Sequence, residues 1–588
     1  MDVASLQDFL RRERQANRAE AALTSMLAEE ALVDRGGCLV DLSITHRQQG
    51  ALTLDCPVND SRFRPGTRID LSCDATRLSG TITDITERGL RLHLRVERRV
   101  DSLPSGPWTA RESDTDLSFL VSQCLARLQP GAPGWSFFST LAGGEPLKRP
   151  AAVPPTSATA AIIDQVIADA GRSIDSSQRE VLDHCASLPS VFGIQGPPGT
   201  GKTMVLALTA ETLARMGRRV MVIAPTHQAV NNALSAIHSF FSGRPLVKVG
   251  DELRRESLDE AIPCRAVRDA TQGLPPRRHQ DLIVGMTFVS GLHNQALRSS
   301  GLVPNALLID EAGQLPLVQG TCAGLFGAGV TLLFGDDAQL PPVFAADVAE
   351  DSLAVSLFQR LRQAHPSLIA RLNTTYRMNA ELCGITAAEF YPGGSDPLMP
   401  CPSVAGKRFH LPGAAIPEGL PAAALSPEPS LVWLPTPDIH SRQANEWEAD
   451  AIARVVATCL RHGKSVRDVA VVTPFRKQAA LIRRRIQGLL PADADLPIVD
   501  TVERVQGLTV DLVAISLAAS DPDFVSEVAG FLFSPNRLNV AISRARTKVI
   551  VACSPTLLEA MPADYAAFLG RESLRRVLAG RAGVPERA

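Results

Sequence analysis

The segment GPPGTGKT, residues 196–203, combines glycines, a lysine and a hydroxyl at a spacing that suits phosphate binding. Glycines let successive backbone N–H groups curl around a phosphate, and a following helix adds the favourable dipole of its N-terminus. In this chemistry Lys202 reaches the β- and γ-phosphates and Thr203 ligates Mg²⁺. The alternative is a glycine-rich structural turn, but an apolar strand-like run precedes the motif and a helical pattern follows it. We therefore predict an ATP site made by Gly196, Pro197, Pro198, Gly199, Thr200, Gly201, Lys202 and Thr203.

Two adjacent acids, Asp310 and Glu311, end the apolar run ALLI. A parallel strand delivers such residues to the carboxyl edge of its sheet, where ligands bind. We predict that Asp310 belongs to the Mg²⁺ shell and that Glu311 orients or deprotonates the attacking water. Acids at a strand end are often merely solvated, and it is the preceding phosphate loop that favours catalysis. A third run, TLLFG, leads to GDDAQLPP, where Gln339 would distinguish ATP from ADP unless the segment is a plain turn.

Short runs of Val, Ile and Leu recur between helical segments from residue 191 onward, without the alternation of half-exposed strands. Buried parallel strands have this pattern. The runs form two series of five, which predicts two tandem doubly wound α/β domains. The expected ranges are 160–365 for the domain with the phosphate loop and DEAG, 366–575 for the second domain, and 576–588 for a frayed tail.

The N-terminal part has a different organisation. Residues 4–34 carry scattered apolar side chains among many Arg and Glu, which predicts a long, largely exposed helical stalk. Alternating runs between Cys38 and Val96 predict a small antiparallel β-barrel. A second apolar helix follows, and then a linker rich in Pro, Ala and Gly. The expected ranges are 1–35 for the stalk, 36–100 for the barrel, and 101–159 for the second helix and linker.

Composition limits the remaining possibilities. The 588 residues are 45% apolar and 21% charged, which suits three to four packed domains. A formal charge of −2 gives no whole-chain sign of nucleic-acid binding, so any basic track must be local. The 11 cysteines form no CxxC pair, and we expect reduced, mostly buried thiols in a cytoplasmic protein. No apolar run is long enough to span a bilayer, and no export signal is expected.

The motifs GPPGTGKT, DEAGQ and GDDAQLPP, in that order, resemble motifs I, II and III of superfamily 1 helicases. The chain is most similar to the 5′-to-3′ branch that contains the nonsense-mediated-decay helicase and the immunoglobulin-mu-binding-protein helicase. Even EEALVDRGGCLVDLSITHRQQG resembles the helix-to-barrel entry of that branch, so two RecA-like domains and an accessory barrel are implied. The later segments similar to the YRM, TP, QG and terminal arginine motifs are TTYRM at 374–378, VVTPFRKQ at 471–478, VDTVERVQG at 499–507 and NRLNVAISRAR at 536–546.

The resemblance implies roles at the nucleotide for further residues. Gln178 is similar to the adenine-reading glutamine, and Tyr376 to the residue that stacks on the base. Arg377 and Arg544 resemble the two arginines that the second RecA-like domain supplies to the γ-phosphate. Gly507, in the QG pair, joins the implied nucleotide contacts. A single arginine would more often form a surface salt bridge, but the ordered motifs favour the nucleotide role.

Contacts to nucleic acid follow from the same resemblance. Such domains grip the strand backbone and stack bases, and neither task demands one residue type. For each threonine the structural alternative is that it only caps the helix that follows its strand. The implied contacts are Pro225, Thr226, Thr287, Thr473, Pro474, Thr501 and Gln506.

Three features depart from the family pattern. Thr509 stands where relatives carry an acidic residue thought to reach the ribose, which leaves the sugar contact open. The segment QGLT also resembles RecD-type and conjugative relaxase helicases, which slightly favours DNA over RNA. The segment before DEAG is short, which predicts little or no helical insertion, and nothing resembles a Cys/His-rich, iron–sulfur nuclease or additional strand-binding module.

These observations predict a helicase or translocase that uses ATP and Mg²⁺, works as a monomer on single-stranded nucleic acid in the 5′-to-3′ direction, and unwinds duplexes. The main alternative is a nucleic-acid-dependent ATPase that translocates or strips proteins without unwinding. A non-motor P-loop enzyme such as a kinase would lack the second domain with its arginine motifs. A scaffold with an inactive ATPase would not need Lys202, Asp310, Glu311 and Gln339 together.

Overall fold

The computed structural model divides the chain into two compact units. The first unit comprises Met1–Gln195, Lys202–Asp337 and Pro341–Arg371, and the second comprises Gly196–Gly201, Ala338–Leu340 and Leu372–Ala588. No helix in the described part of the chain is long and apolar enough to cross a membrane. The structure describes residues 1–25, 32–33, 36–48, 50–59, 61, 63–86, 90–96, 103–113, 118–150, 155–266, 269, 281–293, 302–345, 348, 350–393, 396–413, 416, 419–491 and 493–581.

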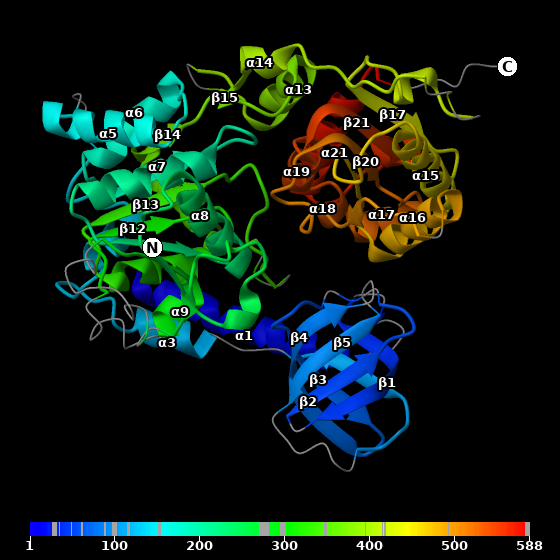
Figure 1. Cartoon of the computed structure of the whole chain (residues 1–588), viewed down its shortest axis with the longest axis horizontal. Coiled ribbons are helices and arrows are strands. Elements are labelled where there is room, and N and C mark those ends of the chain that lie inside the picture. The colour runs from blue at the N-terminus through cyan, green and yellow to red at the C-terminus, as the bar shows by residue number, and fades with distance from the viewer. Residues whose placement is uncertain are drawn as a thin grey trace. The chain divides into compact units, whose positions relative to one another are not determined.

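The first unit contains an eight-stranded sheet of order β10-β9-β11-β8-β12-β13-β7-β14 (Figure 1). Its strands pair in parallel, and the five predicted runs all form buried strands within it. The remaining strands were not predicted because they are short and lack an apolar run of their own. The bounds are β7 Val191–Gln195, β8 Val220–Ala224, β9 Leu246–Val249, β10 Cys264–Arg265, β11 Ile283–Thr287, β12 Ala306–Ile309, β13 Val330–Gly335 and β14 Ile369–Arg371.

Helices connect these strands, and polar side chains mark where several of them begin. Asp175 and Gln178 form a capping box at the start of α6, and the Ser356 hydroxyl accepts a hydrogen bond from the backbone of Gln359 at the start of α12. The bounds are α5 Ser157–Asp169, α6 Ser176–Ala186, α7 Lys202–Arg215, α8 His227–Phe240, α9 Phe288–His293, α11 Leu317–Gly320 and α12 Leu357–Ala364.

The predicted barrel is present, and it is closed and antiparallel, with strand order β1-β2-β5-β4-β3-β6. Alternate residues are buried along its strands, as the sequence pattern predicted. The predicted end at residue 100 was too early, because the last strand pairs with both β1 and β3 and closes the barrel. The bounds are β1 Cys38–Gln48, β2 Ala51–Asp55, β3 Arg68–Cys73, β4 Thr76–Thr86, β5 Arg91–Val96 and β6 Trp108–Glu112.

Two N-terminal predictions need correction. Helix α1, Val3–Ser25, is not only an exposed stalk, because Leu6 and Phe9 at its start are fully buried in the core of the first unit. The end of the predicted helix, residues 26–31 and 34, lies outside the described residues. The stretch expected to be a linker contains, after α3 (Ser118–Leu125), a helix α4 (Trp135–Leu141) whose aromatic side chains enter the same core. Burial of these apolar residues outweighs the Pro and Gly around them.

The second unit contains a five-stranded parallel sheet of order β17-β21-β20-β18-β19, formed by the second predicted series of runs. The domain change predicted at 365 was too early, because β14 still pairs with β7 in the first sheet. The predicted end at 575 was also early, because α21 continues to Leu578. The sheet strands are β17 Leu431–Pro435, β18 Val469–Val472, β19 Ile498–Asp500, β20 Val510–Ser516 and β21 Ala545–Cys553.

The remaining elements of the second unit include a small pair of strands and the helices around its sheet. Most helix starts carry an Asn, Asp or Ser cap, such as Asn379 at α13 and Asn445 at α15. The bounds are β15 Thr374–Thr375, β16 Met399–Pro400, α13 Ala380–Phe390, α14 Pro402–Ala405, α15 Glu446–Arg461, α16 Arg476–Leu489, α17 Pro522–Glu527, α18 Ala529–Leu532, α19 Pro535–Ile542, α20 Pro555–Glu559 and α21 Tyr565–Leu578.

Candidate nucleotide site

The phosphate loop connects the end of β7 to Lys202, the first residue of α7. Gly199 and Gly201 have φ angles of 75° and 79°, in the left-handed region that favours glycine. The Thr200 hydroxyl donates a 2.8 Å hydrogen bond to the carbonyl of Pro197 and closes the loop on itself. The motif therefore has the strand-to-helix position and the glycine-dependent backbone that phosphate binding requires.

The same loop fits closely against the TTYR segment, with which it is grouped in the second unit. The Thr375 hydroxyl donates to the Pro198 carbonyl at 2.9 Å, and the Tyr376 backbone N–H donates to the Gly199 carbonyl at 2.8 Å. A Cβ atom at Gly199 would lie 2.5 Å from Thr375 Oγ1 and 2.6 Å from the Cβ of Arg377. Glycine is therefore required here by both the backbone conformation and the approach of the neighbouring segment.

Lys202 lies between the two acids predicted for catalysis. Its Nζ atom is 3.1 Å from Asp310 Oδ1 and 2.7 Å from Glu311 Oε1. Burial disfavours the charge of Lys202, but the two carboxylates outweigh burial and raise its pKa above the usual range. Burial raises the pKa of Asp310, while the adjacent ammonium group acts in the opposite direction. A lysine, a hydroxyl and a buried carboxylate are the donor set that binds Mg²⁺ and phosphate oxygens, so the residues fit Mg²⁺–ATP.

Glu311 is held in a sparsely populated backbone conformation, with a φ of 52°. Gln314 donates to Oε2 of this carboxylate at 3.1 Å, while Lys202 donates to Oε1 at 2.7 Å. Both carboxylate oxygens are thus fixed, which suits a group that orients water. Our sequence prediction did not include Gln314, although it stands in the DEAGQ motif, because its contact depends on the turn after β12.

The third motif follows β13, which is the neighbour of β7 in the sheet. Gln195, at the end of β7, donates to Asp336 at 3.3 Å and to Asp337 at 3.2 Å, and ties the two strand ends together. A Cβ atom at Gly313 would lie 2.8 Å from the Asp336 carbonyl, so DEAG and GDDAQ also pack in direct contact. The acids of DEAG and the first residues of GDDAQ therefore meet at the carboxyl edge of the first sheet.

Gln339 itself is grouped with the second unit. Asn536 donates to the backbone carbonyl of Gln339 at 2.5 Å, and Asn539 donates to the carbonyl of Ala338 at 2.7 Å. Both asparagines lie on α19 in the NRLN part of the terminal arginine motif. They were missed as site residues because each acts on backbone atoms far away in the sequence.

Arg377 and Arg544 lie near each other in the second unit. Arg377 Nη1 donates to the Ser543 carbonyl at 2.8 Å, and Arg544 Nε donates to the Val540 carbonyl at 3.1 Å. Burial lowers the pKa of Arg377 well below its usual value, and the charges of Arg544 and Arg546 lower it further. A buried group of guanidinium charges is stabilised by an anion, and the triphosphate of ATP is a suitable one.

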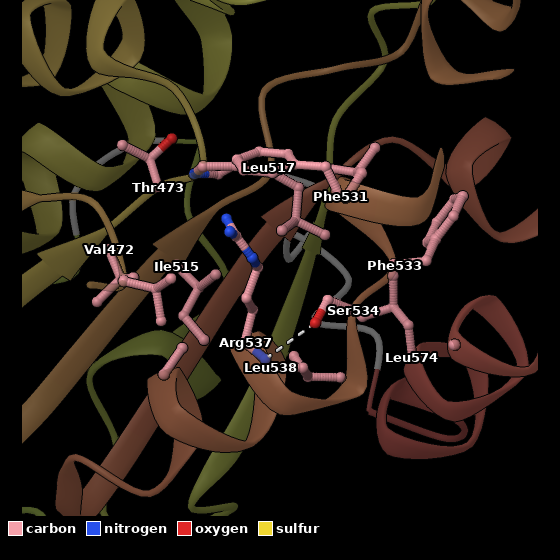
Figure 2. A pocket seen from close by; sticks show the side chains of 15 residues that line it. Val472, Thr473, Ile515, Leu517, Phe531, Phe533, Ser534, Arg537, Leu538 and Leu574 are labelled. Atoms are coloured by element: carbon pink, nitrogen blue, oxygen red, sulfur yellow. Dashed lines mark hydrogen bonds between the residues drawn. The ribbon is translucent and has the colours of Figure 1, made fainter. Parts of the chain in front are cut away.

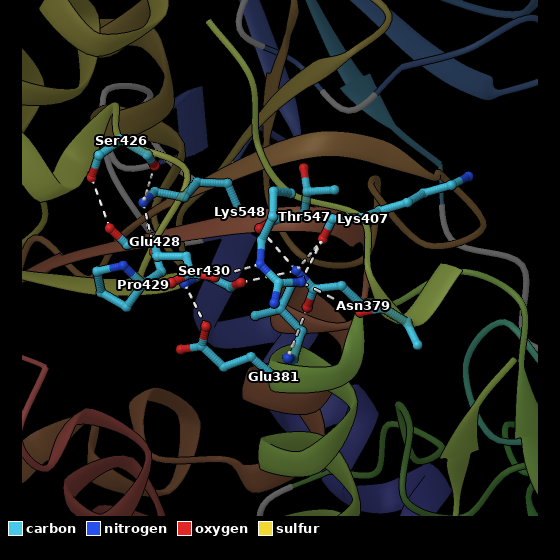
Figure 3. Close-up of polar contacts among 12 residues, drawn as sticks. Asn379, Glu381, Lys407, Ser426, Glu428, Pro429, Ser430, Thr547 and Lys548 are labelled. Atoms are coloured by element: carbon cyan, nitrogen blue, oxygen red, sulfur yellow. Dashed lines mark hydrogen bonds and ion pairs between the residues drawn. The ribbon is translucent and has the colours of Figure 1, made fainter. Parts of the chain in front are cut away.

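Asn379 connects the segments that carry these two arginines (Figure 3). Its backbone N–H donates to the Arg546 carbonyl at 3.0 Å, and its Oδ1 accepts from the backbone N–H of Leu382 at 3.1 Å, capping α13. Its Nδ2 donates to the Lys407 carbonyl at 3.1 Å and to the Ser430 hydroxyl at 2.9 Å. The sequence identified the neighbouring YRM residues but not this asparagine, whose partners lie in three separate segments.

Lys548, on β21, fixes the irregular stretch that precedes β17 (Figure 3). This fully buried side chain donates to the carbonyls of Ala423 at 2.5 Å, Ser426 at 3.0 Å and Pro429 at 2.6 Å. Burial lowers its pKa to about 8, and Glu381 acts in the opposite direction. Lys548 therefore has a positioning role in the second sheet, close to the arginine motif in sequence.

The two residues predicted to contact the base differ in their surroundings. Gln178 is fully buried, and its Oε1 accepts a 3.2 Å hydrogen bond from the backbone N–H of Asp175. Its side chain is thus engaged at the start of α6, so adenine recognition would require it to share or exchange this contact. Tyr376 is 40% exposed, which leaves ring surface accessible for stacking.

The residues predicted to contact nucleic acid fall into two groups, each at the carboxyl edge of one sheet. Thr226 follows β8 and Thr287 ends β11, its neighbour. Thr473 follows β18 and Thr501 follows β19, its neighbour. The members of the two groups are Pro225, Thr226 and Thr287 in the first unit, and Thr473, Pro474, Thr501 and Gln506 in the second, which also carries the predicted nucleotide contact Gly507.

Three of these threonines also act locally on the backbone, as the structural alternative required. Thr226 Oγ1 accepts from Ala229 at 3.2 Å, and Thr287 Oγ1 accepts from Ser290 at 3.3 Å, so both hydroxyls cap helices. Thr473 Oγ1 accepts from Phe475 at 3.5 Å. A hydroxyl that accepts one hydrogen bond retains its own donor, and Thr287 gives this donor to the Ser290 hydroxyl at 2.8 Å, so Thr287 acts locally with both its donor and its acceptor.

Known proteins resemble the chain over this region. Two protein-family models, each described as an AAA domain, match residues 173–381 and 353–556 of this chain. The DNA replication ATP-dependent helicase/nuclease JHS1 of Arabidopsis thaliana is 27% identical over 66% of this chain and 29% of its own length. The corresponding dna2 protein of Schizosaccharomyces pombe is 26% identical over 68% of this chain, again 29% of its own length. The chain thus spans less than a third of the length of these relatives.

Two further matches have more similar lengths. The DNA polymerase alpha-associated DNA helicase A of Schizosaccharomyces pombe is 26% identical over 65% of this chain and 63% of its own length. The crystal structure of the Arterivirus nonstructural protein 10 helicase is 15% identical, with a TM-score of 0.37, and the match covers 90% of this chain and 80% of that one. The chain is thus similar to AAA domains over residues 173–556 and, over about two thirds of its length, to proteins named as DNA helicases.

Proposed function

We propose that the protein is an ATP-dependent helicase or translocase that moves along single-stranded DNA. The observation that carries the proposal is the position of Lys202, between Asp310 and Glu311 and directly after a loop whose glycines adopt left-handed φ angles. This arrangement serves nucleoside triphosphate hydrolysis, and the relatives named as ATP-dependent helicases agree with it.

The residues of this chain have distinct roles in the proposed reaction. Lys202 and the loop N–H groups bind the phosphates, while Thr203 and Asp310 would hold Mg²⁺, which neutralises phosphate charge. Glu311 orients the attacking water and accepts its proton. Gln339 responds to the presence of the γ-phosphate, and the guanidinium groups of Arg377 and Arg544 stabilise the charge that develops on it.

The proposed coupling between ATP hydrolysis and strand movement depends on the residues that contact the γ-phosphate. A ligand shifts a conformational equilibrium only by its differential affinity for the two states. Since Arg377 and Arg544 belong to the second unit, loss of the γ-phosphate changes the charge balance of that unit, which also carries Thr473 and Thr501. We propose that this change alternates the grip on the strand and produces 5′-to-3′ movement and unwinding.

DNA is the proposed track because the named relatives are DNA replication helicases and a DNA polymerase alpha-associated DNA helicase. The QGLT segment, with Thr509 in place of an acidic residue, favours the same choice. Thr509 is half-buried, and its short side chain offers one hydroxyl where a carboxylate would accept two ribose hydrogen bonds. We therefore expect dATP to support turnover about as well as ATP.

The test is steady-state ATPase activity of the purified chain alone, with single-stranded DNA and with single-stranded RNA. Lys202→Ala serves as the blank, and Lys148→Ala, an exposed lysine, as the matched control. Stimulation by DNA that is lost only in Lys202→Ala supports the proposal, and a fluorescent duplex with a 5′ or 3′ tail then tests direction and unwinding. Absence of stimulation by either polymer would contradict it.

A further inference from the structure

The short segment that carries Gln339 leaves the first unit at Asp337. This aspartate is the last residue of the first unit before the chain passes to the second unit at Ala338. It stands two residues before Gln339, and two residues of chain span at most about 7 Å. The contacts that hold the Asp337 side chain therefore limit where the Gln339 side chain can lie.

An arginine of α12 lies against the Asp337 carboxylate. Nη2 of Arg362 is 3.0 Å from Oδ1 of Asp337, and Gln195 at the end of β7 donates to the same oxygen at 3.2 Å. The side chains of Arg362 and Asp337 are 35% and 16% exposed, so water screens this pair less than it screens a surface ion pair. Burial raises the pKa of Asp337, and the charge of Arg362 acts in the opposite direction.

The surroundings of Arg362 differ from those of an ordinary surface arginine, which keeps its nitrogens in water. Its Nε and Nη2 atoms are buried and form no hydrogen bond in the part of the chain that the structure describes. Its guanidinium carbon lies 5.6 Å from the centroid of the Phe358 ring on the same helix. The carboxylate of Asp337 therefore compensates a charge that water reaches poorly, and the contact is an ion pair rather than an aligned hydrogen bond.

Helix α12 is itself held against the second and third motifs. The backbone N–H of Phe358 donates to the Ala312 carbonyl of DEAG at 3.3 Å. A Cβ atom at Gly335 would lie 3.0 Å from Cδ2 of Phe358, so the helix packs directly on the end of β13. Arg362 follows Phe358 by about one helical turn. A helix that contacts both motifs thus presents the guanidinium to Asp337.

The backbone of Gln339 is held within the second unit by α19. Two asparagines of this helix donate to the carbonyls of Gln339 and of the residue before it. Figure 2 shows the start of α19 beside a pocket, where the Ser534 hydroxyl accepts from the backbone N–H of Arg537 at 3.4 Å. The guanidinium carbon of Arg537 lies 3.9 Å from the centroid of the Phe531 ring. The segment is therefore attached to a capped helix in the second unit, while Asp337 is attached to α12 in the first.

We propose that Arg362 is a positioning residue for ATP hydrolysis, which holds Asp337 and thereby sets the place of Gln339 at the γ-phosphate. The inference rests on the proposed function and adds to it a residue that stands outside all of its motifs. Without the ion pair, the segment is free to shift while the phosphate loop stays intact. The nucleotide then still binds, but ATP and ADP are distinguished less well, and hydrolysis slows because small displacements of reacting groups are costly.

The experiment measures kcat, the KM for ATP, and the affinities for ADP and for a non-hydrolysable ATP analogue, all with the full chain and single-stranded DNA. Arg362→Gln should lower kcat by about 10- to 100-fold with less than about threefold change in KM. The preference for the ATP analogue over ADP should fall as well. Arg362→Lys keeps the charge at a single contact, so its kcat should stay within about threefold of the wild type. Arg360→Gln, on the same helix, loses a hydrogen bond to the Leu141 carbonyl and is the matched control.

Two further variants test whether Arg362 acts through Asp337 and Gln339. Asp337→Asn keeps an oxygen that can accept from Gln195 but removes the charge, so it should reproduce the defect of Arg362→Gln. Combining the two changes should lower kcat no further, because both remove the same contact. In a Gln339→Ala background, adding Arg362→Gln should leave the nucleotide preference unchanged for the same reason.

The outcomes separate this inference from the proposed function. If the wild-type chain hydrolyses no ATP, the proposed function fails and the inference fails with it. If the wild type is active and Arg362→Gln matches it in kcat and nucleotide preference, the inference is wrong while the motor proposal stands. A kcat loss with unchanged nucleotide preference and a lowered thermal midpoint would show a purely structural role and would also overturn it. Should Arg362→Gln fail to fold, Asp337→Asn decides through the same measurements.

Discussion

At the scale of single residues, the carboxylate of Glu311 is held through both of its oxygens. Its backbone lies at a φ of 52°, and Lys202 and Gln314 hold its two oxygens. Strain of this kind persists only where surrounding contacts impose it, and it is typical of active sites. The geometry therefore argues for catalysis more strongly than the DE sequence pair did, since adjacent acids at a strand end are common.

Replacing Glu311 by glutamine keeps the side-chain length but removes the base. We expect Glu311→Gln to bind ATP with nearly wild-type affinity while kcat falls by about 10²- to 10⁴-fold. Binding of a fluorescent ATP analogue and steady-state turnover measure the two quantities separately. Glu260→Gln, an exposed acid of the same unit, is the control. Unchanged turnover in Glu311→Gln would remove this residue from the mechanism.

Glu448, on α15, provides a prediction about pH. It is fully buried, and burial raises its pKa to about 8, although hydrogen bonds from Ser516 at 2.6 Å and Ala518 at 2.9 Å oppose the shift. The unfolded chain would titrate this acid near 4.5, so between these values the folded chain binds the extra proton. Stability from this group is complete below about pH 4.5 and is lost as pH rises through about 8.

The corresponding measurement is the thermal midpoint of unfolding at pH 6 and at pH 8.5. Glu448→Gln cannot ionise, so its midpoint should fall less between these two values than that of the wild type. Glu446→Gln changes an acid on the same helix whose side chain is 68% exposed, and it should keep the wild-type slope. An identical slope in all three proteins would show that Glu448 does not control the pH dependence.

At the scale of elements, the ten strand runs were predictable and several helices were not. Strands that are buried on both faces, such as β8 and β12, consist of apolar residues throughout, and that pattern is visible without tertiary information. Helix α1 looked like an exposed stalk because its fully buried residues, Leu6 and Phe9, lie in its first turns. Helix α4 is short and lies among Pro and Gly, so its burial depends on partners elsewhere in the chain.

In the nucleotide site, too, the residues that depend on partners far away in the sequence could not be predicted. The residues predicted to contact phosphate or water occur in motifs with fixed spacing, which is why the sequence alone could indicate them. Asn379, Asn536 and Lys548 act on backbone carbonyls or on side chains of distant segments, so no local pattern marks them. The capping position of Asn379, directly before the helical run AELCG, was the only local signal available.

Asn379 also provides a prediction about the arginine segments. Because it joins the Arg377 segment to the Arg546 carbonyl and to Ser430, its loss should displace Arg377 relative to Arg544. We expect Asn379→Ala to lower kcat by about 10- to 100-fold with less than about threefold change in the KM for ATP. Asn379→Ser keeps a hydroxyl cap at the start of α13 but loses the three Nδ2 contacts, to Lys407, Ser430 and Thr547, so it should show the same kcat defect.

Comparing the two variants separates positioning from folding. The serine variant should unfold closer to the wild-type midpoint than the alanine variant because the cap, worth about 1 kcal/mol, is retained. A kcat defect confined to Asn379→Ala, with a matching loss of stability, would indicate a purely structural role. Equal KM and kcat losses in both would indicate that ATP binding itself, rather than the position of Arg377, is affected.

At the scale of the whole molecule, the balance of charges determines how strongly the binding of a DNA strand should depend on salt. The formal net charge is −2, and 60 basic residues are balanced by 62 acidic ones. The residues predicted to hold the strand are all uncharged, and two of the threonines lie at helix starts, where backbone N–H groups and the helix dipole attract phosphate. Binding would therefore depend more on hydrogen bonds and stacking than on release of counterions.

This distribution makes the salt dependence of DNA binding a decisive measurement. Each phosphate that a cationic side chain neutralises on a single strand contributes about −0.7 to the slope of the logarithm of the binding constant against the logarithm of salt concentration. With only uncharged side chains among the predicted strand contacts, we expect a slope of about −2 or shallower. Anisotropy titrations from low to high KCl would measure it. A slope steeper than about −4 would mean that surface arginines and lysines outside the predicted set carry most of the grip, and the uncharged strand track inferred from the motifs would then be the minor contribution.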